Sequence, residues 1–123
     1  PLMAEHYSSF RRGGTLWVLQ RVTAVFLIAV LAFHFVLLHF VNHAAEITFL
    51  GTQARMSQWG YLATMWLFLV TATFHGVNGV YNALVNQGLT GTAKRVVGGV
   101  LALAGLLLIV QGTRVALAMT NVV

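Results

Sequence analysis

Three long apolar stretches dominate this chain and limit what it can fold into. They cover approximately Trp17–Val41, Trp59–Val85 and Val96–Met119. A helix needs about 20 predominantly apolar residues to cross the hydrocarbon core of a bilayer, so each stretch is long enough to span it once. Only 7 % of the 123 residues are charged, against about 25 % in soluble domains. The sequence therefore predicts an all-α membrane protein, with three transmembrane helices in residues 17–123 and a short polar tail in residues 1–16.

Lysine and arginine indicate the orientation of these helices, because both residues collect on the cytoplasmic side of a membrane. Most of the basic residues flank the same ends of the predicted helices: Arg11, Arg12, Arg21, Lys94 and Arg95. Arg55 and Arg114 lie toward the opposite ends. We therefore expect a cytoplasmic N-terminus and a C-terminus on the outer side. Scattered in this way, the basic residues do not form a nucleic-acid footprint.

The residues that are missing exclude several kinds of chemistry. The chain has no cysteine, so it provides no iron–sulfur ligand, disulfide, thiol nucleophile or covalent haem attachment. Its two acidic residues, Glu5 and Glu46, fall outside the apolar stretches. Proton-coupled transporters usually place a carboxylate within the membrane, so a small transporter is a weak alternative.

Two histidines lie well away from the ends of the apolar stretches, His34 in the first and His75 in the second. An ionisable side chain at that depth is costly and usually faces the protein interior or a cofactor, and neutral imidazole is the commonest metal ligand. The pair therefore suggests ligation of haem b. On antiparallel helices the two histidines differ in height by about 10 Å at 1.5 Å rise per residue, so we expect each to serve a different haem, with the opposite ligand coming from another chain.

The neighbours of His75 fit a cofactor site or a helix contact. Gly79 lies one turn away on the same helix face and leaves room for a flat macrocycle or for a close partner helix. Arg21, at about the height of His75, is suited to pair with a haem propionate. The alternatives are a packing contact with one hydrogen-bonded histidine, and an arginine that extends to lipid phosphate.

Other candidate residues favour simpler interpretations. His39 and His43 are spaced as a metal-binding pair could be, but at the end of the first helix they are more typical of solvated interfacial histidines. The third stretch is rich in small residues, which allow helices to approach closely; they include Gly98, Gly99, Ala102, Gly105 and Gly112. We interpret this stretch as a packing helix.

Taken together, these segments resemble a known family. Arg21-Val-Thr-Ala, a mid-helix His34 thirteen residues later, and His75-Gly-Val-Asn-Gly79 are similar to the membrane-anchor (cytochrome b) subunits of succinate dehydrogenase, respiratory complex II. The resemblance covers Arg21 to about Thr120. The pair of histidines resembles the two-haem members, and the D-type anchor is the closer fit.

The resemblance implies an architecture and a role. The chain would be half of a haem-binding helical bundle, completed by a second anchor subunit, in the inner (cytoplasmic) membrane. It would attach an iron–sulfur subunit and a flavoprotein subunit, bind one or two haem b groups and help pass electrons to quinone. Dehydrogenation of succinate would occur in the other subunits, so this chain is expected to have no catalytic residues of its own.

One departure concerns the quinone. Family members often carry an Asp-Tyr pair about eleven residues after the second-helix histidine, and the tyrosine hydrogen-bonds quinone; this chain has Asn86 and Gln87 there. Tyr81 or Asn86 is the candidate substitute. A haem-free structural anchor of a respiratory complex remains the main alternative function.

Overall fold

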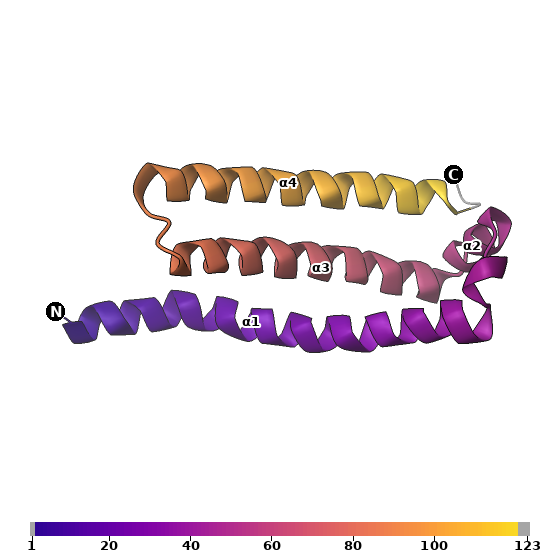
Figure 1. Cartoon of the computed structure of the whole chain (residues 1–123), viewed down its shortest axis with the longest axis horizontal. Coiled ribbons are helices and arrows are strands. Elements are labelled where there is room, and N and C mark those ends of the chain that lie inside the picture. The colour runs from indigo at the N-terminus through magenta and orange to yellow at the C-terminus, as the bar shows by residue number, and fades with distance from the viewer. Residues whose placement is uncertain (1, 121–123) are drawn as a thin grey trace.

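The computed structural model describes the backbone of residues 2–120 and the side chains of residues 14–120. Within that part every regular element is a helical one, and there is no strand. The elements are α1 (Leu2–Val36), a π-helical turn (Leu37–Val41), a 3-10 turn (Ala44–Glu46), α2 (Phe49–Met56), α3 (Trp59–Asn86) and α4 (Gly91–Ala118) (Figure 1). The helix α1 begins at Leu2, so the backbone of the predicted tail continues the first helix; the side chains of residues 1–13 lie outside the described residues.

Three helical segments are long and apolar enough to cross a membrane, Gly14–Val41, Trp59–Asn86 and Gly91–Ala118. This confirms the predicted all-α fold with three spanning helices. The third helix begins five residues before the predicted Val96, at Gly91. Of the residues between, Ala93, Lys94 and Arg95 have high helix propensity, so the helix extends beyond the hydrocarbon. Hydropathy locates the part of a helix that lies in the bilayer and not the residue at which the helix begins.

The connection between the first two spans contains a short helix, α2, which the hydropathy pattern did not predict. Thr48 caps its N-terminus, with its Oγ1 accepting a 3.0 Å hydrogen bond from the Gly51 backbone N–H. Such a cap satisfies a backbone donor that the helix itself leaves unpaired. The helix contacts α3 (Figure 1), and within it Arg55 Nη2 donates a 3.0 Å hydrogen bond to Thr52 Oγ1.

The three long helices lie side by side, with α3 between α1 and α4 and with the described ends of the chain at opposite ends of the molecule (Figure 1). Few side chains are buried by this arrangement. Those below a tenth exposed, among the described residues, are Thr23, Val30, Met56, Asn78, Gly105 and Thr120. Most large apolar side chains face outward, as expected for a chain whose surroundings are lipid and other membrane helices.

Small residues set the contact between α3 and α4. A methyl group added at Gly105 would lie 3.0 Å from Val77 Cγ2 and 3.3 Å from Thr73 Cγ2, and one added at Gly112 would lie 2.6 Å from Leu69 Cδ2. The helices approach this closely only because glycine has no side chain. The predicted packing role is confirmed for these glycines, whereas a methyl group at Gly99 would meet nothing within 4 Å.

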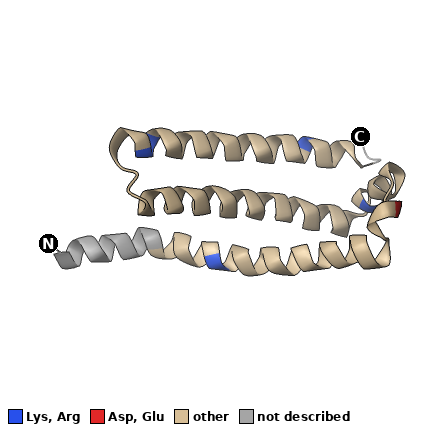
Figure 2. Cartoon of the chain, in the orientation of Figure 1, with Lys and Arg blue, Asp and Glu red and all other residues tan. Residues whose placement is uncertain are grey.

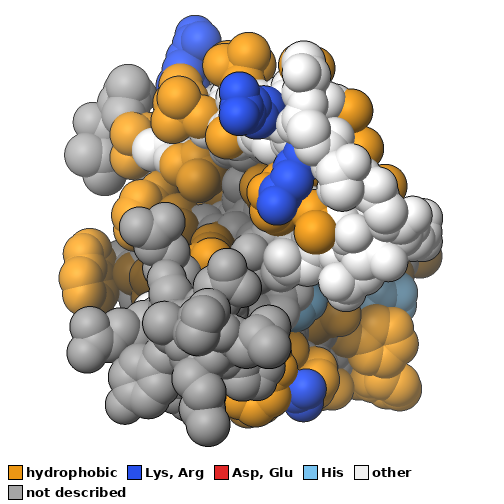
Figure 3. All heavy atoms as spheres, turned by 90° about the vertical axis from the view of Figure 1, so that its left-hand side faces the viewer, with side chains coloured by type: hydrophobic (Ala, Val, Ile, Leu, Met, Phe, Trp, Pro, Cys, Tyr) orange, Lys and Arg blue, Asp and Glu red, His pale blue; other side chains and the backbone are white. Residues whose placement is uncertain are grey.

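Charged side chains mark the two ends of the bundle (Figure 2). Arg21, Lys94 and Arg95 lie toward the end where the chain begins, and Arg55, Arg114 and Glu46 lie toward the other. The end-on view of Figure 3 looks at the first of these ends, where basic and apolar side chains adjoin and no acidic side chain is visible among the described residues. We call it the basic end, and the opposite one the α2 end.

Candidate functional site

His75 lies half-buried in the middle of α3 and contacts Thr23 of α1. The distance from Thr23 Oγ1 to His75 Nδ1 is 3.2 Å. The same hydroxyl lies 2.7 Å from the Leu19 carbonyl oxygen and 3.0 Å from the Gln20 carbonyl oxygen. A hydroxyl has one proton to donate but two lone pairs. With its proton directed at those carbonyls, Thr23 accepts a hydrogen bond from His75 Nδ1–H.

This assignment fixes the chemical form of the imidazole. A neutral histidine that is protonated at Nδ1 has a lone pair on Nε2, and a metal-binding histidine typically donates its other N–H to an oxygen that orients the ring. Thr23 is that oxygen for His75. The hydrogen-bond network therefore leaves His75 Nε2 available as a ligand.

Gln20 of α1 forms a hydrogen bond with the backbone of α3 at His75. Its Nε2 donates to the His75 carbonyl oxygen at 3.2 Å, and its Oε1 accepts from Asn78 Nδ2 at 2.9 Å. Gly79 provides the space, because a methyl group there would lie 3.1 Å from Gln20 Nε2. The room that the sequence assigned to a macrocycle or a partner helix is thus partly filled by the Gln20 amide. Buried polar groups that are paired in this way fix how two membrane helices are rotated against each other.

Sequence reasoning missed both Gln20 and Thr23. Each is a polar residue on the first apolar stretch, and a glutamine within a span is a signal for a contact between helices. Which helix it meets, and at what height, depends on the rotation of α1, which the hydropathy pattern does not specify.

His34 lies farther along α1 in a different environment. It is half-buried, and its Nδ1 is buried without a hydrogen-bond partner. Because Thr23 contacts His75, the eleven residues from Thr23 to His34 place the two histidines about 16 Å apart along the helix axis at 1.5 Å per residue. This is larger than the 10 Å expected from the sequence, and it keeps the two imidazoles at separate sites.

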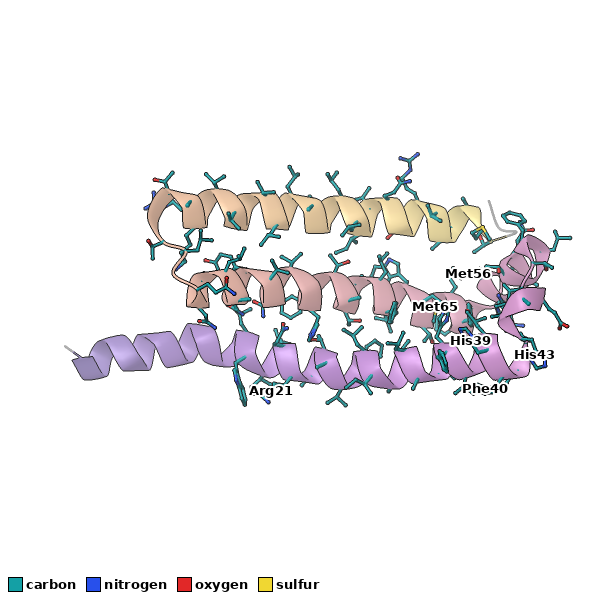
Figure 4. All side chains as sticks on the ribbon, viewed as in Figure 1. Arg21, His39, Phe40, His43, Met56 and Met65 are labelled. Atoms are coloured by element: carbon teal, nitrogen blue, oxygen red, sulfur yellow. The ribbon has the colours of Figure 1, made fainter. Side chains whose placement is uncertain are left out.

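Arg21 and His75 are not brought together by the part of the chain that the structure describes. Arg21 lies within one turn of Thr23 in height but about 200° around the helix, since each residue turns an α-helix by about 100°. Figure 4 shows its side chain on the face of α1 that points away from α3, and its Cζ lies 4.4 Å from the centroid of the Trp17 ring. The guanidinium is exposed and free to meet a group from outside this chain.

His39 lies in the π-helical turn that follows α1 and His43 lies just beyond it, near the α2 end (Figure 4). His39 and His43 are both exposed. The ring of His39 stacks on Phe35 with centroids 4.4 Å apart, and His43 follows the π-helical turn with φ of 53°. The π-helical turn and the change of backbone direction after it remove the regular i, i+4 geometry that two metal ligands on one helix would share.

A cavity of about 630 Å³ opens between α3 and α4 toward the basic end. Its lining combines apolar, polar and basic side chains: Phe74, Val77, Asn78, Tyr81, Lys94, Arg95 and Leu101, with Gly91 and Gly98. The aromatic ring of Tyr81 lies over Gly98, where a methyl group would be 3.3 Å from Tyr81 Cε2. Asn86 is exposed and is not part of the lining. Of the two candidates for a quinone contact, only Tyr81 faces a space that could hold a ring.

Comparison with known protein families identifies the family of this chain. Residues 3–112 match the model of the succinate dehydrogenase/fumarate reductase transmembrane subunit family. No curated protein and no solved structure is similar enough to count as a match. The family match covers most of the chain, so the chain belongs to this family and is a multi-pass membrane subunit of such a complex.

Proposed function

We propose that this chain, a transmembrane subunit of the succinate dehydrogenase/fumarate reductase family, is a haem b-binding anchor that helps to pass electrons to quinone. The observation that supports haem binding most directly is the hydrogen bond between His75 Nδ1 and Thr23 Oγ1, at 3.2 Å. It orients the imidazole and leaves Nε2 free.

The haem would supply one-electron transfer within the membrane, and residues of this chain would hold it. His75 would hold one haem and His34 a second, and the two histidines lie about 16 Å apart along the helix axis. Thr23 orients the first imidazole, and Gln20 with Gly79 fixes α1 against α3 at that level. Arg21 is the proposed partner of a propionate that reaches the outward face of α1.

That outward placement fits a bundle completed by another subunit. The faces of α1 and α4 that point away from α3 carry large exposed apolar side chains, including Val25, Ile28, Leu103 and Leu107. A second anchor packed on this chain would provide the opposite haem ligands. In the proposed inner-membrane orientation the basic end is cytoplasmic, and the iron–sulfur subunit attaches there, together with the flavoprotein.

The cavity beside Tyr81 is the proposed contribution of this chain to the quinone site. Its volume lies within the range of about 300–1,000 Å³ typical of small-molecule pockets, its walls are mostly apolar, and the Tyr81 hydroxyl is a hydrogen-bond donor for a carbonyl oxygen. Lys94 and Arg95 at its mouth favour any negative charge that develops on reduction of the ring.

Replacement of Tyr81 by phenylalanine tests this site. Loss of one hydrogen bond to the bound ring should raise the KM for a soluble quinone analogue by about 5- to 10-fold, using about 1 kcal/mol per bond, while oxidation of succinate by an artificial acceptor stays unchanged. Asn86→Ala is the matched control and should leave both rates unaltered. An Asn86→Ala effect larger than that of Tyr81→Phe would place the quinone contact at Asn86 instead.

Purification of the complex through an affinity tag on this chain tests the function as a whole. We expect a flavoprotein, an iron–sulfur protein and a second small membrane subunit to copurify, together with the Soret band of a low-spin haem b. Copurification of the subunits without any haem absorption would support the alternative, a haem-free structural anchor.

A further inference from the structure

Asn78 of α3 belongs to two features of the molecule at once. It lines the cavity between α3 and α4, and it also forms a hydrogen bond with Gln20 of α1. Phe74, Asn78 and Tyr81 follow one another at intervals of four and three residues, so they share one face of the helix, and all three line the cavity. Asn78 therefore adds an amide group to the wall that carries the Tyr81 ring.

The hydrogen bonds of Gln20 fix how the Asn78 amide is oriented. A backbone carbonyl oxygen can only accept, so the Gln20 atom that lies 3.2 Å from the His75 carbonyl oxygen is the amide nitrogen, Nε2. The other end of the Gln20 amide is the acceptor Oε1, and the Asn78 atom that lies 2.9 Å from it is the donor Nδ2. Asn78 Oδ1 is consequently the end of the amide that α1 does not use.

Asn78 Oδ1 forms no hydrogen bond within the described residues, but it is not sealed off. Among the described side chains, the fully buried polar atoms without a partner are His34 Nδ1 and Arg55 Nε, and Asn78 Oδ1 is not one of them. The side chain as a whole is 9 % exposed, and the open space that it lines is the cavity. An unpaired amide oxygen is costly in apolar surroundings, so this oxygen favours an occupant that donates a hydrogen bond.

An oxygen that can only accept distinguishes the two redox forms of a quinone. The oxidised ring carries carbonyl oxygens, which only accept, whereas the quinol carries hydroxyl groups, which both donate and accept. The Tyr81 hydroxyl can serve either form, because it also donates and accepts. Asn78 Oδ1 matches the hydroxyl of the quinol alone, and both N–H groups of Asn78 are on the nitrogen that is directed at α1.

We propose that Asn78 Oδ1 accepts a hydrogen bond from a hydroxyl group of the quinol, and that Asn78 thereby sets the preference of the cavity for the reduced ring. The inference rests on the proposed quinone site and adds to it a residue that discriminates between substrate and product. The hydrogen bonds from Asn78 to Gln20, and from Gln20 to the His75 carbonyl, hold the amide in the orientation that this role requires.

Initial rates of quinone reduction by the purified complex test the proposal. A short-chain soluble quinone is the substrate and its quinol is added as the competing product, which gives a KM for the quinone and a Ki for the quinol. Rates are normalised to succinate oxidation by an artificial acceptor, which measures the amount of assembled complex. Asn78→Leu should raise the Ki of the quinol about 5-fold, as expected for one lost hydrogen bond, and leave the KM of the quinone close to the parental value.

Three further variants keep this comparison independent of packing. Asn78→Asp retains an acceptor oxygen in either protonation state and should keep the parental Ki. Asn78→Ala repeats the test without added bulk in case the leucine variant assembles poorly. Thr73→Val is the matched control, because it removes a polar group from the same helix at a residue that does not line the cavity and whose hydroxyl donates only to the Leu69 carbonyl oxygen of its own helix.

The outcomes separate this inference from the proposed function. A rise in the quinol Ki alone in Asn78→Leu or Asn78→Ala, absent from Asn78→Asp and Thr73→Val, supports the proposal. An equal rise in Ki and KM, or no change in either, overturns it and leaves Asn78 as a helix contact. Tyr81→Phe tests the site itself: a raised quinone KM in that variant retains the quinone site even if Asn78 has no effect, whereas unchanged constants in both the Tyr81 and the Asn78 variants reject the cavity as that site.

Discussion

Replacement of His75 by leucine is expected to abolish the low-spin spectrum of one haem in the assembled complex. The imidazole would be its axial ligand from this chain, and leucine has no atom that can replace Nε2. The measurement is the reduced-minus-oxidised spectrum of the purified complex, together with its haemochrome content. A low-spin spectrum that is unaltered in an assembled His75→Leu complex would refute the assignment.

Thr23 variants separate ligation from packing in the same experiment. Thr23→Val keeps the shape of the side chain but removes the acceptor for His75 Nδ1–H, and loss of such an orienting partner typically costs about 10- to 100-fold in metal affinity. We expect partial loss of haem or a shifted spectrum in Thr23→Val. Thr23→Ser, which retains the hydroxyl, should behave as the parent does. If Thr23→Val lowers complex yield without changing the spectrum, the hydroxyl acts only in helix contact.

Replacement of Gly105 by isoleucine is expected to separate α4 from α3 and to reduce the amount of assembled complex strongly. The first added carbon would already lie 3.0 Å from Val77 and 3.3 Å from Thr73, both branched side chains on a helix that cannot yield locally. Overpacking of this kind costs about 1–3 kcal/mol. The measurement is the thermal stability and yield of the detergent-purified complex.

Gly99→Ile is the matched control for that variant, because it makes the same change on the same helix at a position where a methyl group meets nothing within 4 Å. It should assemble at close to the parental yield. If both variants assembled equally well, the α3–α4 contact would not depend on the small residue at Gly105.

The apolar stretches alone determined the number of spans, because a continuous apolar segment of about 20 residues crosses hydrocarbon as a helix that satisfies its own backbone. Hydropathy also identified His34 and His75 as candidates, since an ionisable imidazole within the membrane is costly and usually functional. The small residues of the third stretch likewise predicted a close helix contact, because only they let two backbones approach. Each of these conclusions depends on chemistry within a single helix.

Only the tertiary structure decided how each helix is rotated about its own axis relative to its neighbours. Hydropathy is nearly uniform around these helices, so it did not specify that Thr23 and Gln20 face His75 while Arg21 faces away from α3. In a membrane, apolar side chains do not determine which face of a helix meets its neighbour, because lipid is as apolar as the neighbouring helix. The rotation is instead fixed by a few polar pairs and glycine contacts, whose partners are distant in sequence and are identified only once the helices are placed side by side.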